Sequence, residues 1–210
     1  MTTYVLVPGF WLGAWAWDEV AAPLRADGHD VHTIEPVPAR GTTVTDHVDQ
    51  VTDLLRELDD VVLVGHSYGG LVITAAADRV PERVARLVYV DTGPLPDGMS
   101  QADFDGAPPA AVDGMVPVAE AAPPVVHERG RPQPIATATD PVHHTGAWRS
   151  VPRTAILCSF SKAQLDGLAS TVPTFALMAG DGWTHVELAG DHWPMFSAPT
   201  ALAALLAAES

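Results

Sequence analysis

Short apolar runs alternate with longer segments of helical periodicity along most of this chain. The apolar runs are 4–7, 30–34, 61–64, 87–90, 154–158 and 184–188. Apolar residues recur at 44, 48, 51, 55 and 58 with polar residues between them, which is the spacing of one buried helix face. Further helices are predicted over 15–27, 71–80, 161–178 with a break near Pro173, and 200–208. Short buried strands that alternate with helices indicate a parallel sheet with helices on both faces.

The pentapeptide Gly65-His66-Ser67-Tyr68-Gly69 lies between the apolar run 61–64 and the helix predicted over 71–80. A Gly-x-Ser-x-Gly turn between a strand and a helix holds the serine hydroxyl exposed at the end of the strand. The glycines leave room for a backbone that turns tightly. An ordinary Gly/Ser-rich loop would lack this strand and helix, so the pattern predicts that Ser67 is a nucleophile.

The alternation stops between 93 and 152, where proline, glycine, alanine and aspartate are frequent. Connections of this length are usually functional or disordered. The segment follows the strand after the Ser67 helix, which favours a cap or lid over the alternative of a flexible surface excursion. We therefore expect one domain over 1–210, with 93–152 inserted as a lid.

A serine hydroxyl needs a base, and His192 is the best-placed histidine. In hydrolases with such a turn the chain order is serine, acid, histidine. His192 follows the strand predicted over 184–188, and loops at the carboxyl ends of parallel strands carry the chemistry of such sheets. His185 lies inside that strand, and His66 is too close to Ser67 in sequence. The adjacent pair His143-His144 is weak evidence for a metal.

Composition narrows the partners and the compartment. The 210 residues are 47% hydrophobic and carry a formal net charge of −15. This charge argues against nucleic acid or an anionic membrane as a partner, because phosphate binding requires clustered Lys and Arg. The single cysteine, Cys158, excludes an intrachain disulfide, and the first residues resemble neither a signal peptide nor a membrane span. We expect a cytoplasmic protein with a small-molecule substrate.

The chain resembles the α/β-hydrolases, and most of all the branch of plant methylesterases and hydroxynitrile lyases. The matching pieces are Val5-Leu6-Val7-Pro8-Gly9 with Gly13-Ala14-Trp15, Leu63-Val64-Gly65-His66-Ser67, Val151-Pro152-Arg153-Thr154 and Gly190-Asp191-His192. The resemblance implies an α/β-hydrolase fold with about six mostly parallel strands and a cap. It also implies an oxyanion hole made by the backbone N–H groups of Phe10 and Tyr68, and no cofactor or metal.

The chain departs from the family pattern in the first loop, at the acid and after the histidine. Pro8-Gly9 replaces the usual His-Gly, which need not remove a backbone N–H donor at Phe10. Ser161 stands at the position that matches the family's usual aspartate. Hydroxynitrile lyases of this branch have a lysine where this chain has Trp193, which lowers the expectation of cyanohydrin chemistry.

Three aspartates between Ser67 and His192 could replace the missing acid. Asp91 directly follows the strand predicted over 87–90 and can point to the same rim as Ser67. Asp166 falls in a predicted helix, and Asp181 falls in a turn between two glycines. We predict that Asp91 is the acid, against the alternative of a turn-forming aspartate before Thr92-Gly93-Pro94.

These features predict a serine hydrolase that cleaves a small-molecule ester through Ser67, His192 and Asp91 and an acyl-enzyme. Trp11 and Trp193 border the site and are candidates to line the substrate pocket. Two other functions remain open from the sequence. One is a lyase or isomerase that uses the same three residues as an acid–base device, and the other is a binding protein with a vestigial triad.

Overall fold

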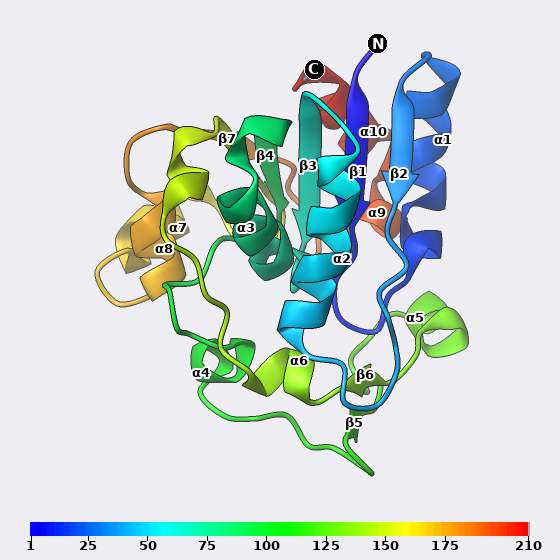
Figure 1. Cartoon of the computed structure of the whole chain (residues 1–210), viewed down its shortest axis with the longest axis vertical. Coiled ribbons are helices and arrows are strands. Elements are labelled where there is room, and N and C mark those ends of the chain that lie inside the picture. The colour runs from blue at the N-terminus through cyan, green and yellow to red at the C-terminus, as the bar shows by residue number, and fades with distance from the viewer. Residues whose placement is uncertain (210) are drawn as a thin grey trace.

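A six-stranded parallel sheet forms the centre of the molecule (Figure 1). The computed structural model describes residues 1–209, and Ser210, the last residue of the predicted domain, lies outside the described residues. The strands are β1 (Thr3–Val7), β2 (Asp30–Thr33), β3 (Val61–His66), β4 (Val84–Val90), β7 (Arg153–Leu157) and β8 (Trp183–Glu187). Their spatial order is β2-β1-β3-β4-β7-β8, and every neighbouring pair is parallel. The predicted α/β-hydrolase arrangement of the sheet is confirmed.

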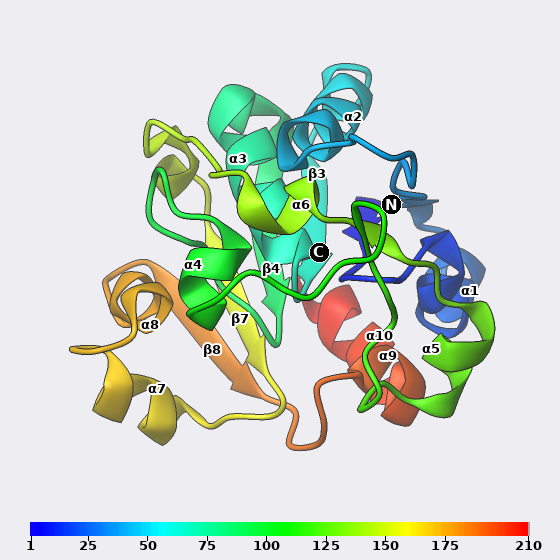
Figure 2. The same ribbon diagram turned by 90° about the horizontal axis from the view of Figure 1, so that it is seen from below.

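Helices cover both faces of the sheet, which explains why its strands are apolar on both sides (Figure 2). Helices α2 (Val44–Arg56) and α3 (Gly69–Arg79) pack on the face that holds Val61 and Leu63 of β3. Helices α1 (Asp18–Ala26) and α10 (Pro199–Ala208) pack on the opposite face with Val62 and Val64. The alternation of side chains along β3 therefore feeds two hydrophobic cores.

Local sequence sets several helix boundaries. Thr43 and Asp46 form a capping box that begins α2. The helix expected over 15–27 is divided into a 3₁₀ turn, η1 (Ala14–Trp17), and α1. The segment expected over 161–178 becomes α7 (Lys162–Leu168) and α8 (Pro173–Met178), since Pro173 cannot continue a helix but fits the first turn of the next one.

The segment 93–152 runs between β4 and β7. Most of it lies below the carboxyl ends of the strands in Figure 1, and its last residues run up beside α3 to the start of β7. It folds into short elements: α4 (Gln101–Asp105), β5 (Met115–Val116), α5 (Pro124–Arg129), β6 (Gln133–Pro134), α6 (Ala136–Thr139) and η3 (Ala147–Ser150). Strands β5 and β6 form a separate antiparallel pair. The segment thus has secondary structure of its own, and its opening and closing as a lid stays a prediction.

Asp78, near the end of α3, fastens the final part of this segment to the core. Its carboxylate accepts hydrogen bonds from the backbone N–H groups of Thr145 (2.6 Å), Gly146 (2.9 Å) and Trp148 (3.1 Å). The Trp148 side chain that follows is buried in the core beside α3. Partial burial raises the pKa of Asp78, but the hydrogen bonds from Thr145 and Trp148 lower it by more, so the pKa of Asp78 lies below its usual value.

We expect Asp78→Ala to lower the free energy of unfolding by about 1–2 kcal/mol at pH 7, because three backbone donors lose a charged acceptor that is partly exposed to water. Because the pKa of Asp78 is lowered in the folded state, its ionised carboxylate stabilises the fold above about pH 4. This stabilisation is lost as the pH falls through the pKa of the folded state. The difference from wild type in urea unfolding should therefore shrink toward pH 2–3. Asp53→Ala removes an exposed carboxylate that contacts Arg56, and it should change the stability little. Equal effects of the two substitutions would contradict this role of Asp78.

Candidate functional site

Ser67 lies in a tight turn between β3 and α3, in a conformation that few side chains adopt. Its φ is 51°, in the left-handed region. A Cβ on Gly65 would lie 2.6 Å from the carbonyl oxygen of Gly69, and one on Gly69 would lie 2.6 Å from that of Val7. Only glycine therefore fits two residues before and two residues after Ser67. The turn presents the serine at the carboxyl end of the central strand, as the pentapeptide predicts.

His192 and Asp91 are joined by a hydrogen bond although 101 residues separate them. The Nδ1 of His192 lies 2.7 Å from Oδ2 of Asp91. Asp91 follows β4 and His192 lies in the loop between β8 and α9 (Pro194–Ser197), so both come from the carboxyl edge of the sheet. An ionised carboxylate only accepts hydrogen bonds, so Nδ1 carries a proton, and in the neutral form of the ring Nε2 is the nitrogen without one. Ser67, Asp91 and His192 line the same cavity.

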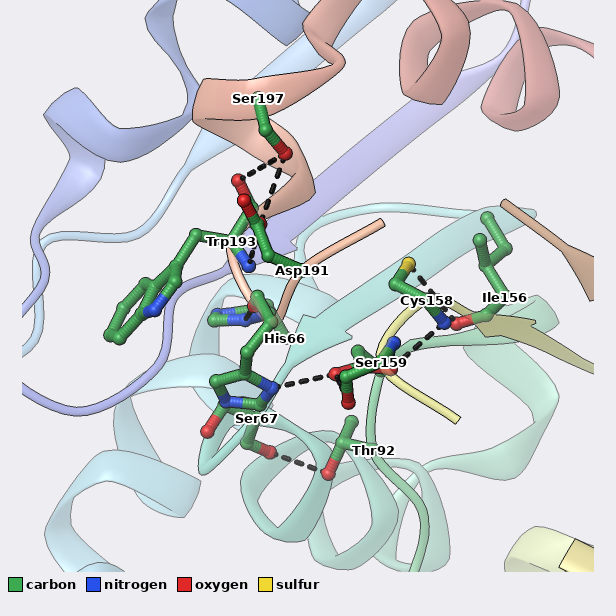
Figure 3. A network of polar contacts seen from close by, with 11 residues as sticks. His66, Ser67, Thr92, Ile156, Cys158, Ser159, Asp191, Trp193 and Ser197 are labelled. Carbon is green, nitrogen blue, oxygen red and sulfur yellow. Dashed lines mark hydrogen bonds and ion pairs between the residues drawn. The ribbon is translucent and has the colours of Figure 1, made fainter. Parts of the chain in front are cut away.

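Further donors surround the Asp91 carboxylate, whose side chain has no exposed surface. Figure 3 shows two of the residues that supply them, Cys158 and Ser159, in the polar network that also includes Ser67. The backbone N–H groups of Cys158 and Ser159 each donate to Oδ1 at 2.8 Å, and the Ser159 hydroxyl donates to Oδ2 at 2.6 Å. Burial raises the pKa of Asp91, but the hydrogen bonds from His192, Ser159 and Cys158 outweigh it and lower the pKa. The carboxylate is therefore held in its charged form.

Ser159 is a site residue that the sequence analysis missed. Alignment with the family pattern placed Ser161 at the usual acid position, but Ser161 caps α7 and pairs with Gln164. The hydroxyl that reaches Asp91 belongs to Ser159, which follows β7 by two positions. The available signal was topological, since β4 and β7 are adjacent and parallel and their ends meet at one edge of the sheet.

The other candidate acids lie away from His192. Asp166 is exposed and pairs with Lys162 four residues earlier on α7. Asp181 is exposed in the turn before β8, and its backbone carbonyl accepts from Arg153. Neither carboxylate lines the cavity that holds Ser67.

The cavity has a volume of about 470 Å³ and a largely apolar wall. Both predicted pocket residues, Trp11 and Trp193, contribute to it, as does Phe10 of the loop after β1. Tyr68 follows Ser67 directly; its buried ring meets that of Phe10 edge-on at 4.8 Å, and its hydroxyl lies 2.9 Å from Nδ1 of His47. The sequence analysis did not foresee the cavity side chains of Phe160, Thr174 and Phe175.

Within residues 1–209 no group of three or more histidine, cysteine or acidic side chains is arranged to hold a metal ion. The ring of His143 contacts Asp97, and His144 donates to the backbone carbonyl of Leu95. No helix in this described part of the chain has the length and apolar character needed to cross a bilayer.

The ring of His66 holds the His192 loop in place through a hydrogen bond to its backbone. It is fully buried, and its Nε2 lies 2.7 Å from the backbone carbonyl oxygen of His192, to which Nε2–H donates. Its Nδ1 has no hydrogen-bond partner within residues 1–209, and a Cβ on Gly9 would lie 2.8 Å from it. Burial, together with the neighbouring His192, lowers the pKa of His66 to about 3. The ring is therefore neutral and stays so in mild acid.

This buried neutral histidine makes the fold sensitive to acid. The unfolded chain takes up a proton at His66 below about pH 6.5, whereas the native state resists until about pH 3. Stability should therefore fall as the pH falls through this window, by about 2 kcal/mol between pH 7.5 and pH 5 from this group. Urea unfolding of His66→Gln, whose amide can donate to the same carbonyl, should show a pH dependence that is flatter by this amount.

The exposed His127 provides the matched control for that measurement. His127→Gln, measured in the same way, gives the effect of removing a histidine from an exposed position. If His66→Gln and the wild type lose the same stability between pH 7.5 and pH 5, burial of a neutral ring at this position is not the cause.

Comparison with known proteins agrees with the fold. The model of the alpha/beta hydrolase family matches residues 4–205. The chain is 42% identical to the carbendazim hydrolyzing esterase of Nocardioides sp. (strain SG-4G) over 101 residues, which are 43% of this chain and 42% of that protein. It is 36% identical to methylesterase 8 of Arabidopsis thaliana over 112 residues, which are 48% of this chain and 41% of that protein. The matched stretches thus cover less than half of either relative.

Solved structures extend the likeness of the fold over the whole chain. An extracellular α/β-hydrolase from a Paenibacillus species superposes with a TM-score of 0.77 at 24% identity, over 99% of this chain and 98% of that one. Tomato methylketone synthase I bound to 2-tridecanone gives a TM-score of 0.75 at 19% identity, over 99% and 97%. The family match and the methylesterase relatives confirm the resemblance seen in the sequence: this chain belongs to the alpha/beta hydrolase family and is similar to its plant methylesterase branch.

Proposed function

We propose that this protein is a carboxylic ester hydrolase that acts on small, uncharged or weakly polar esters with Ser67 as nucleophile. The observation that carries the proposal is the buried hydrogen bond between Asp91 and His192 at the cavity that holds Ser67. A serine, a histidine and a carboxylate in this relation are recognised by geometry and role. The esterase and methylesterase relatives support the same class of reaction.

In the first half of the reaction, Oγ of Ser67 attacks the ester carbonyl carbon and its proton passes to Nε2 of His192. The carbonyl π bond opens to an oxyanion. When the carbonyl re-forms, the bond to the alcohol breaks, and the alcohol leaves with the proton from Nε2. The acyl group is then attached to Ser67. Water then attacks the carbonyl carbon of the acyl group and gives its proton to Nε2 of His192. When the carbonyl re-forms again, the bond to Oγ breaks and Ser67 takes the proton from Nε2, which releases the carboxylic acid and the free serine.

The backbone N–H groups of Phe10 and Tyr68 are proposed to bind the oxyanion. Phe10 lies in the loop after β1 and lines the cavity, and Tyr68, directly after Ser67, is the N-cap residue of α3. A donor in such a position is worth about 3–4 kcal/mol of transition-state stabilisation in acyl transfer. The dense packing of Gly69 against the Val7 carbonyl fixes the two loops relative to each other.

Asp91 is proposed to stabilise the imidazolium that forms on His192. Its carboxylate is ionised and fully desolvated, and its oxygens are occupied by His192, Ser159 and Cys158. A fixed negative charge beside Nδ1 sets the tautomer of the ring and favours its positive charge during reaction. This intact arrangement argues for catalysis and against a vestigial triad.

The cavity wall supports a substrate with a compact apolar or aromatic part. The aromatic side chains that line the cavity with Ser67 are Phe10, Trp11, Phe160, Phe175 and Trp193. A cavity of about 470 Å³ holds a small ester rather than a polymer.

We also propose a cytoplasmic location, since the buried Cys158 is free and the fold contains no disulfide within its described residues. Burial raises the pKa of this thiol to about 12, which makes it unreactive.

Ser67→Ala should lower turnover of a small test ester such as p-nitrophenyl acetate by a factor on the order of 10⁴–10⁶, because it removes the proposed nucleophile. The wild type should be labelled at Ser67 by a fluorophosphonate probe, and the variant should not. His192→Ala should have a similar effect, since residues that act as a unit do not contribute additively. Full turnover by folded Ser67→Ala protein would overturn the proposal.

Asp91→Asn should lower turnover by a factor on the order of 10³–10⁴, because the amide cannot stabilise the imidazolium and favours the wrong tautomer of His192. Asp166→Asn and Asp181→Asn are matched controls, since both carboxylates are exposed and lie away from the cavity. They should stay near wild type. If Asp91→Asn keeps most of its turnover while one of the controls loses it, the acid has been wrongly assigned.

A further inference from the structure

One carboxylate lines the cavity without belonging to the proposed triad. Among the residues that line it, the ionisable side chains are Asp91, His192 and Asp105. Asp91 and His192 are paired with each other. Asp105 comes from α4, in the segment that covers the carboxyl edge of the sheet (Figure 2). It places a negative charge in the wall of a cavity that is otherwise mostly apolar.

The short helix α4 turns one face toward the cavity. Gln101, Phe104 and Asp105 line it, and these residues are spaced by three and four along the helix. The helix begins at a capping box made by Ser100 and Asp103 and ends at Gly106 in the left-handed conformation. Both ends of α4 are therefore defined, and the orientation of Asp105 follows from the helix.

The charge of Asp105 has no cationic partner within residues 1–209. Its Oδ1 accepts a hydrogen bond from the Gln101 amide at 3.0 Å. Three of the other four aspartates of the same segment have partners of other kinds: Asp97 contacts His143 and the N–H of His144, Asp103 caps α4, and Asp113 pairs with Arg40. Asp105 is an exposed residue, and the partial burial of its carboxyl raises its pKa more than the Gln101 bond lowers it.

We propose that Asp105, oriented by Gln101, forms a subsite for an ammonium or N–H donor group carried by the ester at the end remote from its reacting carbonyl. This inference rests on the proposed esterase activity and names the substrate class of the same site. An ammonium group supplies the missing positive charge and donates to the free oxygen of Asp105. An ester that carries a carboxylate at this remote end is disfavoured by the same negative charge.

The test compares two esters of nearly equal shape, methyl 4-(aminomethyl)benzoate and methyl 4-ethylbenzoate, which differ by an ammonium in place of a methyl group. Homologues with one and two further methylenes in each series cover the distance between Ser67 and Asp105. The ratio of kcat/KM for ammonium over methyl should reach about five- to tenfold in the wild type at the best spacer length. Asp105→Asn should bring it to about one, because the isosteric amide has no charge.

Asp113→Asn is the matched control, since it removes one negative charge from the same segment at an exposed position outside the cavity. It should keep the preference of the wild type, which separates the subsite from the general attraction of an acidic protein. Asp105→Lys should reverse the selectivity toward methyl esters that carry a carboxylate at the same place. A wild-type ratio near one at every spacer length, or a ratio that survives Asp105→Asn, overturns the subsite.

Binding of the same esters to Ser67→Ala protein, measured by calorimetry, separates failure of the subsite from failure of the proposed function. If the wild type hydrolyses the neutral esters without preferring the ammonium series, the esterase proposal stands and the subsite is wrong. If no ester is hydrolysed but the ammonium series binds about five- to tenfold more tightly in an Asp105-dependent way, the subsite stands and the reaction is wrong.

Discussion

The hydrogen bond between Asp91 and His192 depends on a buried, ionised carboxylate, and much of the structure serves to keep that carboxylate charged. A desolvated carboxylate is costly unless donors surround it. Here the end of β7 supplies the N–H groups of Cys158 and Ser159, while the loop after β8 supplies His192. The donors come from strands that follow β4 in the sheet order, so the parallel register of β4, β7 and β8 is what assembles the site.

The sequence predicts the parts of this structure that repeat or that demand special backbone. The apolar runs and the spacing of Val44, Val48, Val51 and Leu55 predict the sheet and α2, because burial on two faces leaves a pattern in the sequence. Ser67 is predicted because the turn around it requires glycine on either side. His192 and Asp91 are predicted from strand ends, and their hydrogen bond agrees with that reasoning.

Features that depend on contacts between distant segments could not be predicted in the same way. Ser161 seemed the counterpart of the family acid because alignment counts positions along one strand, whereas the structure brings Ser159 to Asp91 across two strands. The segment 93–152 has elements of two to six residues, too short to show a hydrophobic period. The sequence therefore does not identify Asp105 as a cavity residue. This follows only from the structure, in which Gln101, Phe104 and Asp105 of α4 line the cavity.

The placement of the acid after β4 has a geometric explanation. Strands β4 and β7 are parallel neighbours, and their carboxyl ends meet beside the loop that carries His192. A carboxylate at the end of either strand can approach Nδ1, provided that the other strand end offers donors instead of a second negative charge. Two carboxylates there would repel each other and raise a pKa. Ser159 fulfils this condition, because its hydroxyl and N–H both donate to Asp91. The serine at the end of β7 is thus the physical counterpart of the aspartate at the end of β4.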